Sequence, residues 1–318
     1  MTNPKRTVLL LGASGTIGHA TAEALIATGH EVIAPLRPGS HTSADAIAVP
    51  CKMSNAELAS IMADHACDTV ISCVASRSGA PVEARAIDYG LNSAALRAAV
   101  DAGVSQFVLL SAICVQKPRL TFQHAKLAFE AELQASPLSW TIVRPTAYFK
   151  SLSGQANRIR EGKPFLLFGN GELTACKPIS NSDLACFLVN CLTDPGARNR
   201  ILPIGGPGPA ITPRMQGNML FEAMGRPPHF RHVPLPMMTV IIAGLSILGT
   251  VSQRLRDKAE LARIGRYYAT ESMLVWNATT NRYDPDATPS FGNDTLADHY
   301  RRLASREVAD DRGAHAVF

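Results

Sequence analysis

The sequence lacks the cysteine pattern of a secreted or zinc-binding protein. Its seven cysteines are an odd number without any CxxC pair: Cys51, Cys67, Cys73, Cys114, Cys176, Cys186 and Cys191. Such cysteines usually act as small hydrophobic side chains in a reducing compartment. The first apolar run, residues 8–11, ends at Gly12 and is too short for the core of a secretory signal peptide. We therefore expect a cytoplasmic protein with reduced thiols and no metal site.

The sequence also lacks a large excess of charge of one sign. It has 31 basic and 26 acidic residues, which gives a net charge of +5. The basic residues are scattered, except for a group that consists of Arg254, Arg256, Lys258, Arg263 and Arg266. A dedicated nucleic-acid-binding protein would concentrate more positive charge on one element. The composition therefore argues against a nucleic-acid partner and leaves an anionic small molecule or a membrane surface open.

No apolar run is long and regular enough to predict a membrane span. The strongest candidate, residues 235–251, has 17 residues and contains Pro236, Gly244 and Gly249, whereas a spanning helix needs about 20 apolar residues. A buried helix, or a lid over a ligand site, is the favoured interpretation. An interfacial helix stays open because the basic group follows directly, so residues 235–266 are a candidate for peripheral membrane contact.

Short apolar runs alternate with helical segments over the first two thirds of the chain. We expect strands near residues 7–11, 31–34, 46–49, 69–73, 106–110 and 139–143, and helices that begin near residues 16, 54, 83, 121 and 151. This order is typical of a doubly wound parallel α/β sheet. A glycine- and proline-rich break at 205–209 precedes a helix that opens near Thr212. We therefore predict a cofactor-binding domain over 1–205 and a smaller, mostly helical region over 206–318 that packs on it and covers the substrate.

A glycine-rich turn connects the first predicted strand to the first predicted helix. The turn supplies these candidate cofactor-binding residues: Gly12, Ser14, Gly15, Thr16, Ile17 and Gly18. Small residues allow the backbone to approach a pyrophosphate, and the exposed N–H groups at the start of the helix stabilise its negative charge. In this context the turn predicts a Rossmann-type dinucleotide site.

The end of the second predicted strand indicates which dinucleotide binds. An NAD-selective site places a carboxylate there to hold the ribose 2′-hydroxyl, but this chain has Arg37. A guanidinium group suits the 2′-phosphate of NADP, so we expect NADPH. An ordinary solvated role for Arg37 remains the alternative.

The GxxGxxG spacing resembles the extended and atypical branches of the short-chain dehydrogenase superfamily. This resemblance implies that Ala75 lines the adenosine side, that Ser111 lies near the nicotinamide and that Pro145 belongs to the segment beneath it. It also implies that Lys126 hydrogen-bonds the nicotinamide ribose. Phe122 stands one helical turn before Lys126, where the superfamily carries a catalytic Tyr whose hydroxyl protonates an oxygen. We therefore expect an acceptor other than a carbonyl group.

Longer blocks resemble a narrower family, the NADPH-dependent 8-vinyl reductases of chlorophyll and bacteriochlorophyll biosynthesis. They are residues 109–118, 122–130, 142–155, 174–180, 201–209 and 264–273, and the similarity covers nearly the whole chain. The resemblance implies hydride transfer from NADPH, without flavin or a protein-bound metal, to the 8-vinyl group of divinyl chlorophyllide or protochlorophyllide. The macrocycle can delocalise the resulting negative charge, so no Tyr is needed to protonate an oxyanion.

Such a tetrapyrrole substrate requires an apolar cover and a cation for its propionate. Candidate substrate contacts are Phe122, His124, Tyr148, Phe149 and Lys150, with Arg158 and Lys177 as further partners for the carboxylate. Each of these cations is equally well explained as a solvated charge. The substrate also suggests a location at the periphery of the photosynthetic membrane.

Two other functions remain open at this point. One is a non-catalytic NADP-binding sensor or assembly factor, and the other is an enone-type C=C reductase. The sequence leaves undetermined the oligomeric state, the preferred pigment, the hydride face and the proton donor.

Overall fold

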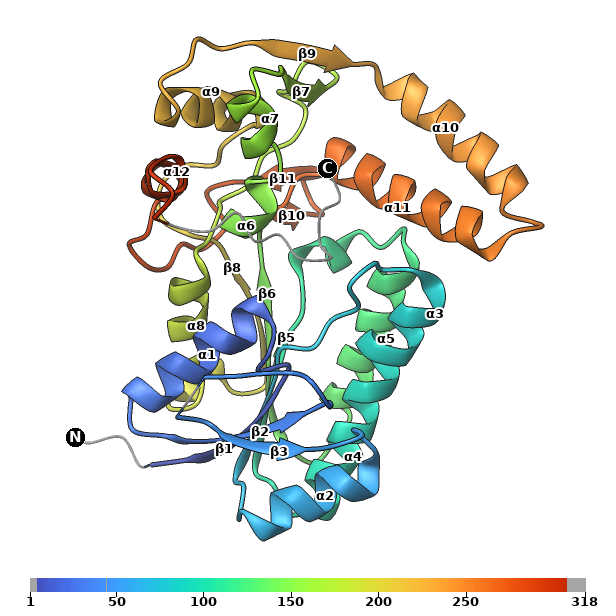
Figure 1. Ribbon diagram of the computed structural model, residues 1–318. Helices are drawn as coiled ribbons and strands as arrows, with labels where there is room; N and C mark the ends of the chain where they lie inside the picture. Colours follow the sequence, from blue (N-terminus) through green and yellow to red (C-terminus); the bar gives the residue numbers. More distant parts are fainter. Residues whose placement is uncertain (1–4, 44, 308–318) are drawn as a thin grey trace. The chain divides into compact units, whose positions relative to one another are not determined.

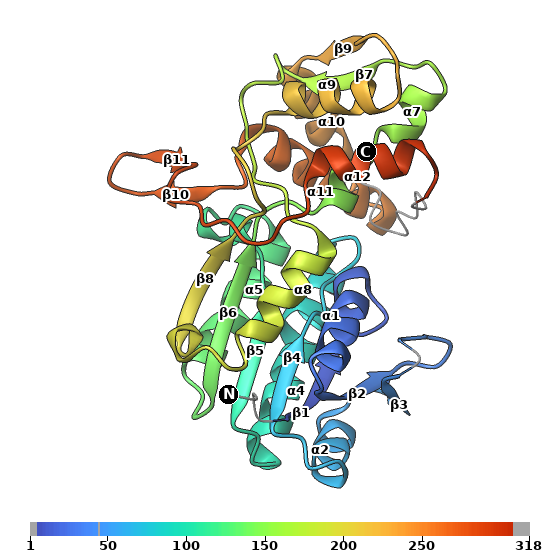
Figure 2. The same ribbon diagram turned by 90° about the vertical axis from the view of Figure 1, so that its left-hand side faces the viewer.

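The computed structural model describes residues 5–43 and 45–307, which belong to two compact units (Figures 1 and 2). Unit 1 consists of Met1–Ser76, Val82–Pro145 and Asn181–Pro203. Unit 2 consists of Arg77–Pro81, Thr146–Ser180 and Ile204–Phe318.

Unit 1 contains a seven-stranded sheet in the order β3-β2-β1-β4-β5-β6-β8. Neighbouring strands from β3 to β6 run parallel. The order reverses between β1 and β4, which is the position where doubly wound sheets bind their ligands. The strands are β1 Thr7–Leu11, β2 Glu31–Leu36, β3 Ile47–Pro50, β4 Thr69–Ser72, β5 Gln106–Leu110, β6 Ser139–Pro145 and β8 Arg200–Ile204.

Helices cover both faces of this sheet (Figure 1). On one face lie α1 Thr16–Ala27 and α8 Asn181–Asn190; on the other lie α2 Asn55–Asp64, α4 Asn92–Asp101 and α5 Thr121–Gln134. Short segments complete the unit: α3 Pro81–Ala84, the π-helix η1 Arg85–Leu91, and the 3-10 turns η2 Ile113–Gln116 and η3 Pro195–Ala197. Strand residues such as Leu9, Val70 and Phe107 are fully buried beneath α2, α4 and α5 in one core cluster.

The predicted doubly wound α/β sheet is therefore confirmed, with β1 to β6 at the expected places. The strand β8 was not expected, because residues 200–204 lead directly into the glycine- and proline-rich break. Its place beside β6 is a tertiary feature that no local pattern reveals.

Unit 2 is mostly helical and has its own hydrophobic core. Phe165, Phe221 and Tyr300 lie in that core, and the expected helix near Thr212 is α9, capped by the Thr212 hydroxyl. The elements are α6 Phe149–Leu152, α7 Ala156–Arg160, β7 Phe165–Phe168, α9 Pro213–Ala223, β9 Phe230–Val233, α10 Leu235–Leu248, α11 Gln253–Thr270, β10 Val275–Asn277, β11 Arg282–Asp284 and α12 Leu296–Ala304.

Three segments of the chain contribute to unit 2, the first of which is the short stretch Arg77–Pro81. The chain leaves the sheet after β6, returns for α8 and β8, and leaves again at Ile204, so residues 146–180 belong with the C-terminal part. The division into 1–205 and 206–318 stays a prediction about domains.

The helix α10 differs from the expectation of a buried helix. Met238 is its buried residue, and most of its other apolar side chains are exposed. The buried interpretation is therefore wrong, while the lid and interfacial interpretations stay open. Within residues 5–43 and 45–307, no helix is both long enough and apolar enough to cross a bilayer.

Candidate cofactor-binding and active site

In the glycine turn after β1, a side chain at Gly12 or Gly18 would clash with neighbouring backbone atoms. Gly12 has a φ of +79°, and a Cβ there would lie 3.0 Å from the backbone of Cys73 at the end of β4. A Cβ on Gly18 would lie only 2.0 Å from the carbonyl oxygen of Gly12. The turn is thus held closely against its neighbours, as a dinucleotide-binding turn must be.

The start of α1 is open to an anion. Gly15 precedes the helix, and Ser14, Gly15 and Thr16 are exposed. The backbone N–H groups and the positive helix end favour a phosphate at this position. Ile17 is half-buried on the first turn, so the residues present fit a dinucleotide pyrophosphate.

Arg37 lies directly after β2, beside the glycine turn. Its side chain is exposed, and β2 pairs with β1 in parallel. The same loop contacts the turn through the Thr42 hydroxyl, which donates a hydrogen bond to the carbonyl of Ala13 at 3.4 Å. Arg37 is therefore at the sheet edge where an adenosine ribose would lie. Ala75 is exposed after β4, next to the switch point.

Cys73, which follows β4 beside the turn, behaves as a hydrophobic residue. Burial raises the pKa of its thiol to about 12, so the thiol stays protonated at neutral pH. All seven cysteines, every one within the described part of the chain, are free.

The inner face of α5 carries both residues of the expected pair. Phe122 and Lys126 are buried on the side that faces the sheet, one turn apart, together with Phe129 and Glu130. Gln123 fixes the start of this helix, because its amide accepts hydrogen bonds from the backbone N–H groups of Arg119 and Leu120. The prediction that Phe122 and Lys126 lie one turn apart on the same side of a helix is thus confirmed.

Lys126 forms an ion pair with a carboxylate that the sequence did not indicate. Its Nζ lies 2.9 Å from Oδ1 of Asp88, and the side chains are only 10% and 0% exposed. Asp88 also accepts hydrogen bonds from the backbone N–H of Ser76, at 3.3 Å, and from the Ser76 hydroxyl, at 2.5 Å. The buried carboxylate is well satisfied, and it holds the ammonium group in one place.

A π-helical turn brings Asp88 to this position. Asp88 lies in η1, where the widened turn disturbs the regular hydrogen-bond ladder. The amide of Asn92 donates to the carbonyls of Ile87 and Asp88 and accepts from the hydroxyl of Ser72 at the end of β4, at 2.6 Å. The π-turn is therefore anchored to the strand that borders the switch point, and π-turns of this kind are frequent at functional sites.

A second buried ion pair lies one turn further along α5. Glu130 accepts hydrogen bonds from the Ser111 hydroxyl, at 2.5 Å, and from Nε of Arg144, at 3.2 Å, and Arg144 also binds its other carboxylate oxygen. Ser111 follows β5 and Arg144 lies on β6, next to the buried Pro145. Because the Ser111 hydroxyl already donates to Glu130, it has only acceptor capacity left for a ligand.

His124 lies on the other side of α5, away from Lys126. It is exposed and lines a pocket of about 490 Å³ between η1 and α5, together with Arg85, Tyr89 and Arg119. This placement separates His124 from Phe122, with which the sequence had grouped it as a candidate substrate contact.

The other candidate substrate residues are in unit 2. Phe149 is 3% exposed and packs in that unit's core, with its ring 5.4 Å from the ring of His299. Tyr148 and Lys150 flank it and are half-buried. The Lys177 ammonium donates to the carbonyl of Thr288 at 2.9 Å, so it already has a structural role.

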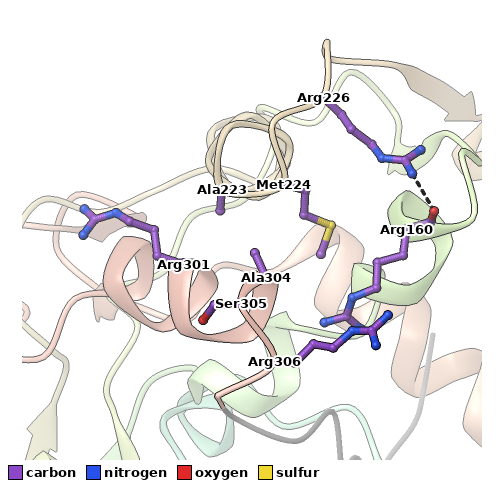
Figure 3. Close-up of a pocket in the computed structure, with 8 residues that line it drawn as sticks. All are labelled: Arg160, Ala223, Met224, Arg226, Arg301, Ala304, Ser305 and Arg306. Atoms are coloured by element: carbon purple, nitrogen blue, oxygen red, sulfur yellow. Dashed lines mark hydrogen bonds between the residues drawn. The ribbon is translucent and has the colours of Figure 1, made fainter.

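A pocket of about 600 Å³ also lies in unit 2, beside α7, α9 and α12 (Figure 3). Four arginines line it: Arg160, Arg226, Arg301 and Arg306. The residues that line this pocket include none of the predicted cofactor or substrate residues.

Comparison with known proteins agrees with this geometry. A family model described as NAD(P)H-binding matches residues 12–195. The chain is 42% identical over 332 residues to the divinyl chlorophyllide a 8-vinyl-reductase of Oryza sativa subsp. indica, which covers 98% of this chain and 82% of the relative. It is also 42% identical to the corresponding protein of Cucumis sativus, over 99% of this chain and 81% of the relative. Both relatives are described as chloroplastic.

The solved structure of UDP-glucose 4-epimerase from Thermotoga maritima has a TM-score of 0.69 to this chain at 16% identity, over 95% of this chain and 99% of that one. At this identity the likeness shows the fold alone. The match to the NAD(P)H-binding model and the near full-length identity to the plant reductases go further: the chain belongs to the NAD(P)H-binding family of divinyl chlorophyllide a 8-vinyl-reductases.

Proposed function

We propose that this protein reduces the 8-vinyl group of a divinyl chlorophyllide or protochlorophyllide to an ethyl group with NADPH, in chlorophyll or bacteriochlorophyll biosynthesis. The observation that carries the proposal is the inner face of α5. It keeps a buried, oriented Lys126 and presents Phe122 where a carbonyl-reducing relative needs a hydroxyl. This combination suits transfer to a conjugated C=C bond, and the near full-length similarity to the plant reductases supports the substrate class.

NADPH, rather than NADH, is the proposed cofactor. It supplies a hydride for one vinyl carbon, and a proton completes the ethyl group. The glycine turn holds the pyrophosphate, Arg37 binds the 2′-phosphate, and Ala75 borders the adenosine. Support for this assignment comes from the exposed guanidinium of Arg37 beside the turn and from the close backbone packing at Gly12 and Gly18.

Lys126 is the proposed contact to the nicotinamide ribose. Asp88 does not touch the cofactor in this scheme; it is a positioning residue that fixes the Lys126 ammonium group through the 2.9 Å ion pair. Ser111 and Pro145 border the nicotinamide. The Glu130–Arg144 pair holds Ser111 as an acceptor, so Ser111 serves to orient the cofactor rather than to protonate the substrate.

Phe122 is the proposed apolar surface beside the pigment ring. Tyr148 and Lys150 are further proposed pigment contacts, and Phe149, whose side chain is 3% exposed, is proposed to support them. His124 is not included, because it is exposed on the opposite face of α5. We also propose that the protein works at the periphery of the photosynthetic membrane, since its pigment substrate is apolar.

The test is a reaction with purified protein, NADPH and divinyl chlorophyllide under anaerobic, flavin-free conditions. The expected result is a shift of the Soret band and a mass gain of two hydrogens on the pigment. If NADPH binds but the pigment mass does not change, the protein is a non-catalytic NADP-binding module. If small enones are reduced and the pigment is not, an enone-type reductase is the correct function.

A further inference from the structure

The helix α10 exposes apolar side chains along its whole length and into the turn that follows. Val240 and Ile247 are each 71% exposed, and Val251 is 86% exposed. Met237, Ile241 and Leu248 are also exposed. Scattered apolar residues are normal on a protein surface, but a continuous group over several helical turns marks an interaction surface.

This apolar surface belongs to a well-defined hairpin of α10 and α11. The guanidinium of Arg263 on α11 donates to the hydroxyl of Ser246 on α10 at 2.7 Å and is paired with Glu260. At the tip, a Cβ on Gly249 would lie 3.1 Å from the backbone of Arg256, so glycine lets the two helices meet closely. The tip points away from α9 and α12 of the same unit (Figure 1). The exposed surface is therefore built on two connected helices.

Positive charge follows the apolar tip directly. Arg254, Arg256 and Lys258 are exposed on the first turns of α11, and residues 235–256 contain no Asp or Glu. An apolar helix beside basic residues is the pattern of an element that lies in a membrane interface and is attracted by anionic lipids.

We infer that the α10–α11 hairpin, residues 235–270, docks on the surface of a bilayer that contains anionic lipid. The 14 residues of α10 extend about 21 Å, too short to cross a bilayer but suitable to lie along its surface. A second copy of the chain is a poorer occupant, because the basic tips would repel each other. The inference goes beyond the proposed reaction, and it is tested without pigment or NADPH.

The experiment measures flotation of the full chain with two kinds of vesicle, one of phosphatidylcholine alone and one of phosphatidylcholine mixed with phosphatidylglycerol. We expect binding to the mixed vesicles that weakens at 1 M salt, where the screening length falls to about 3 Å. The double variant Ile247→Asn/Leu248→Asn should weaken partitioning at least about tenfold. The triple variant Arg254→Gln/Arg256→Gln/Lys258→Gln should remove the preference for the anionic vesicles.

A matched control comes from apolar residues of equal exposure outside the hairpin. Val82 is 72% and Leu173 is 53% exposed, against 71% and 53% for Ile247 and Leu248. The double variant Val82→Asn/Leu173→Asn should bind the mixed vesicles within about twofold of the original chain, and circular dichroism should show that both double variants are folded.

Three outcomes would overturn the inference. The original chain does not float with the mixed vesicles, or the control loses binding as strongly as the tip variant. In the third, the tip variant binds the mixed vesicles as strongly as the original chain. The hairpin is then a lid or, if the tip variant has lost a lipid-free oligomer that the original chain forms, a contact between copies. A failed reduction reaction leaves the vesicle result unaffected, so the two proposals can fail separately.

Discussion

The inner face of α5 and the outer face of α10 depart from the usual distribution of side chains in opposite ways. On α5, charged residues are buried: Lys126 with Asp88, and Glu130 with Arg144. On α10, apolar residues are exposed. Buried polar groups and exposed apolar groups are the informative exceptions in a fold. The buried charged groups are paired with opposite charges within the protein. The exposed apolar side chains of α10 lack comparable cover within unit 2, and they therefore indicate contact with a surface outside the protein.

The largest loss of stability is expected when the buried carboxylate of Asp88 is removed. We expect Asp88→Ala to lower the free energy of unfolding by about 3–5 kcal/mol, because it leaves the buried Lys126 without its carboxylate partner. Denaturant unfolding followed by circular dichroism measures this change. Asp101→Ala, which removes an exposed carboxylate near the end of the same helical run, should have little effect. The double variant Asp88→Ala/Lys126→Met should recover part of the loss.

Lys126→Met tests whether the buried pair serves function as well as stability. We expect kcat/KM to fall about 100-fold, equivalent to about 2.7 kcal/mol of transition-state stabilisation. The fold should be less affected than in Asp88→Ala, because Asp88 keeps two hydrogen bonds from Ser76. Lys52→Met, at an exposed position of the same unit, is the control. A change of less than about twofold would show that Lys126 has no catalytic role.

The additivity of these two variants separates a positioning role from a general structural one. If Asp88 acts through Lys126, the NADPH affinity of Asp88→Ala/Lys126→Met should be no lower than that of Lys126→Met alone. Additive losses would contradict the positioning role.

Arg37→Ala removes an exposed charge of unit 1, in contrast to the substitutions in the buried ion pairs. We expect the Kd for NADPH to rise about tenfold, which is about 1.4 kcal/mol, and the Kd for NADH to stay the same. Titration of NADPH fluorescence gives both values. An equal loss for the two cofactors would contradict the 2′-phosphate assignment.

His299 is a half-buried titratable group of unit 2 whose pKa lies below its ordinary value of 6.5, mainly because of burial and also because of the positive charge of Arg302. The unfolded chain therefore binds more protons than the folded chain between the lowered pKa and 6.5. Stability should decrease as the pH falls through this range. The decrease in Tm should be smaller in His299→Gln, and equal decreases in the two proteins would contradict the prediction.

The smallest change in the free energy of unfolding is expected for the exposed apolar residues of α10. Val240→Ala should change the free energy of unfolding by at most about 0.5 kcal/mol, because the side chain is already in water. Val70→Ala, at a fully buried position on β4, should cost about 2 kcal/mol or more. A large loss in Val240→Ala would mean that α10 is covered within the free protein.

Sequence patterns were sufficient where the relevant partners are close along the chain. The alternation of strands and helices, the glycine turn and the one-turn spacing of Phe122 and Lys126 all depend on local periodicity. Asp88 could not be identified in this way, because its role arises from a π-turn on one helical segment that packs against another helix. The exposure of α10 was likewise hidden, since a buried helix and an unpartnered one have the same apolar composition.

The class of fold, the glycine turn and the absence of a hydroxyl at Phe122 could therefore be predicted from the amino-acid chain alone, because backbone geometry and side-chain chemistry at these places follow from neighbouring residues. The three-dimensional fold was needed to show that Lys126 is paired with Asp88, that Ser111 donates to Glu130, and that α10 exposes its apolar residues. These properties depend on which distant segments meet, and burial, desolvation and ion pairing exist only once they have met.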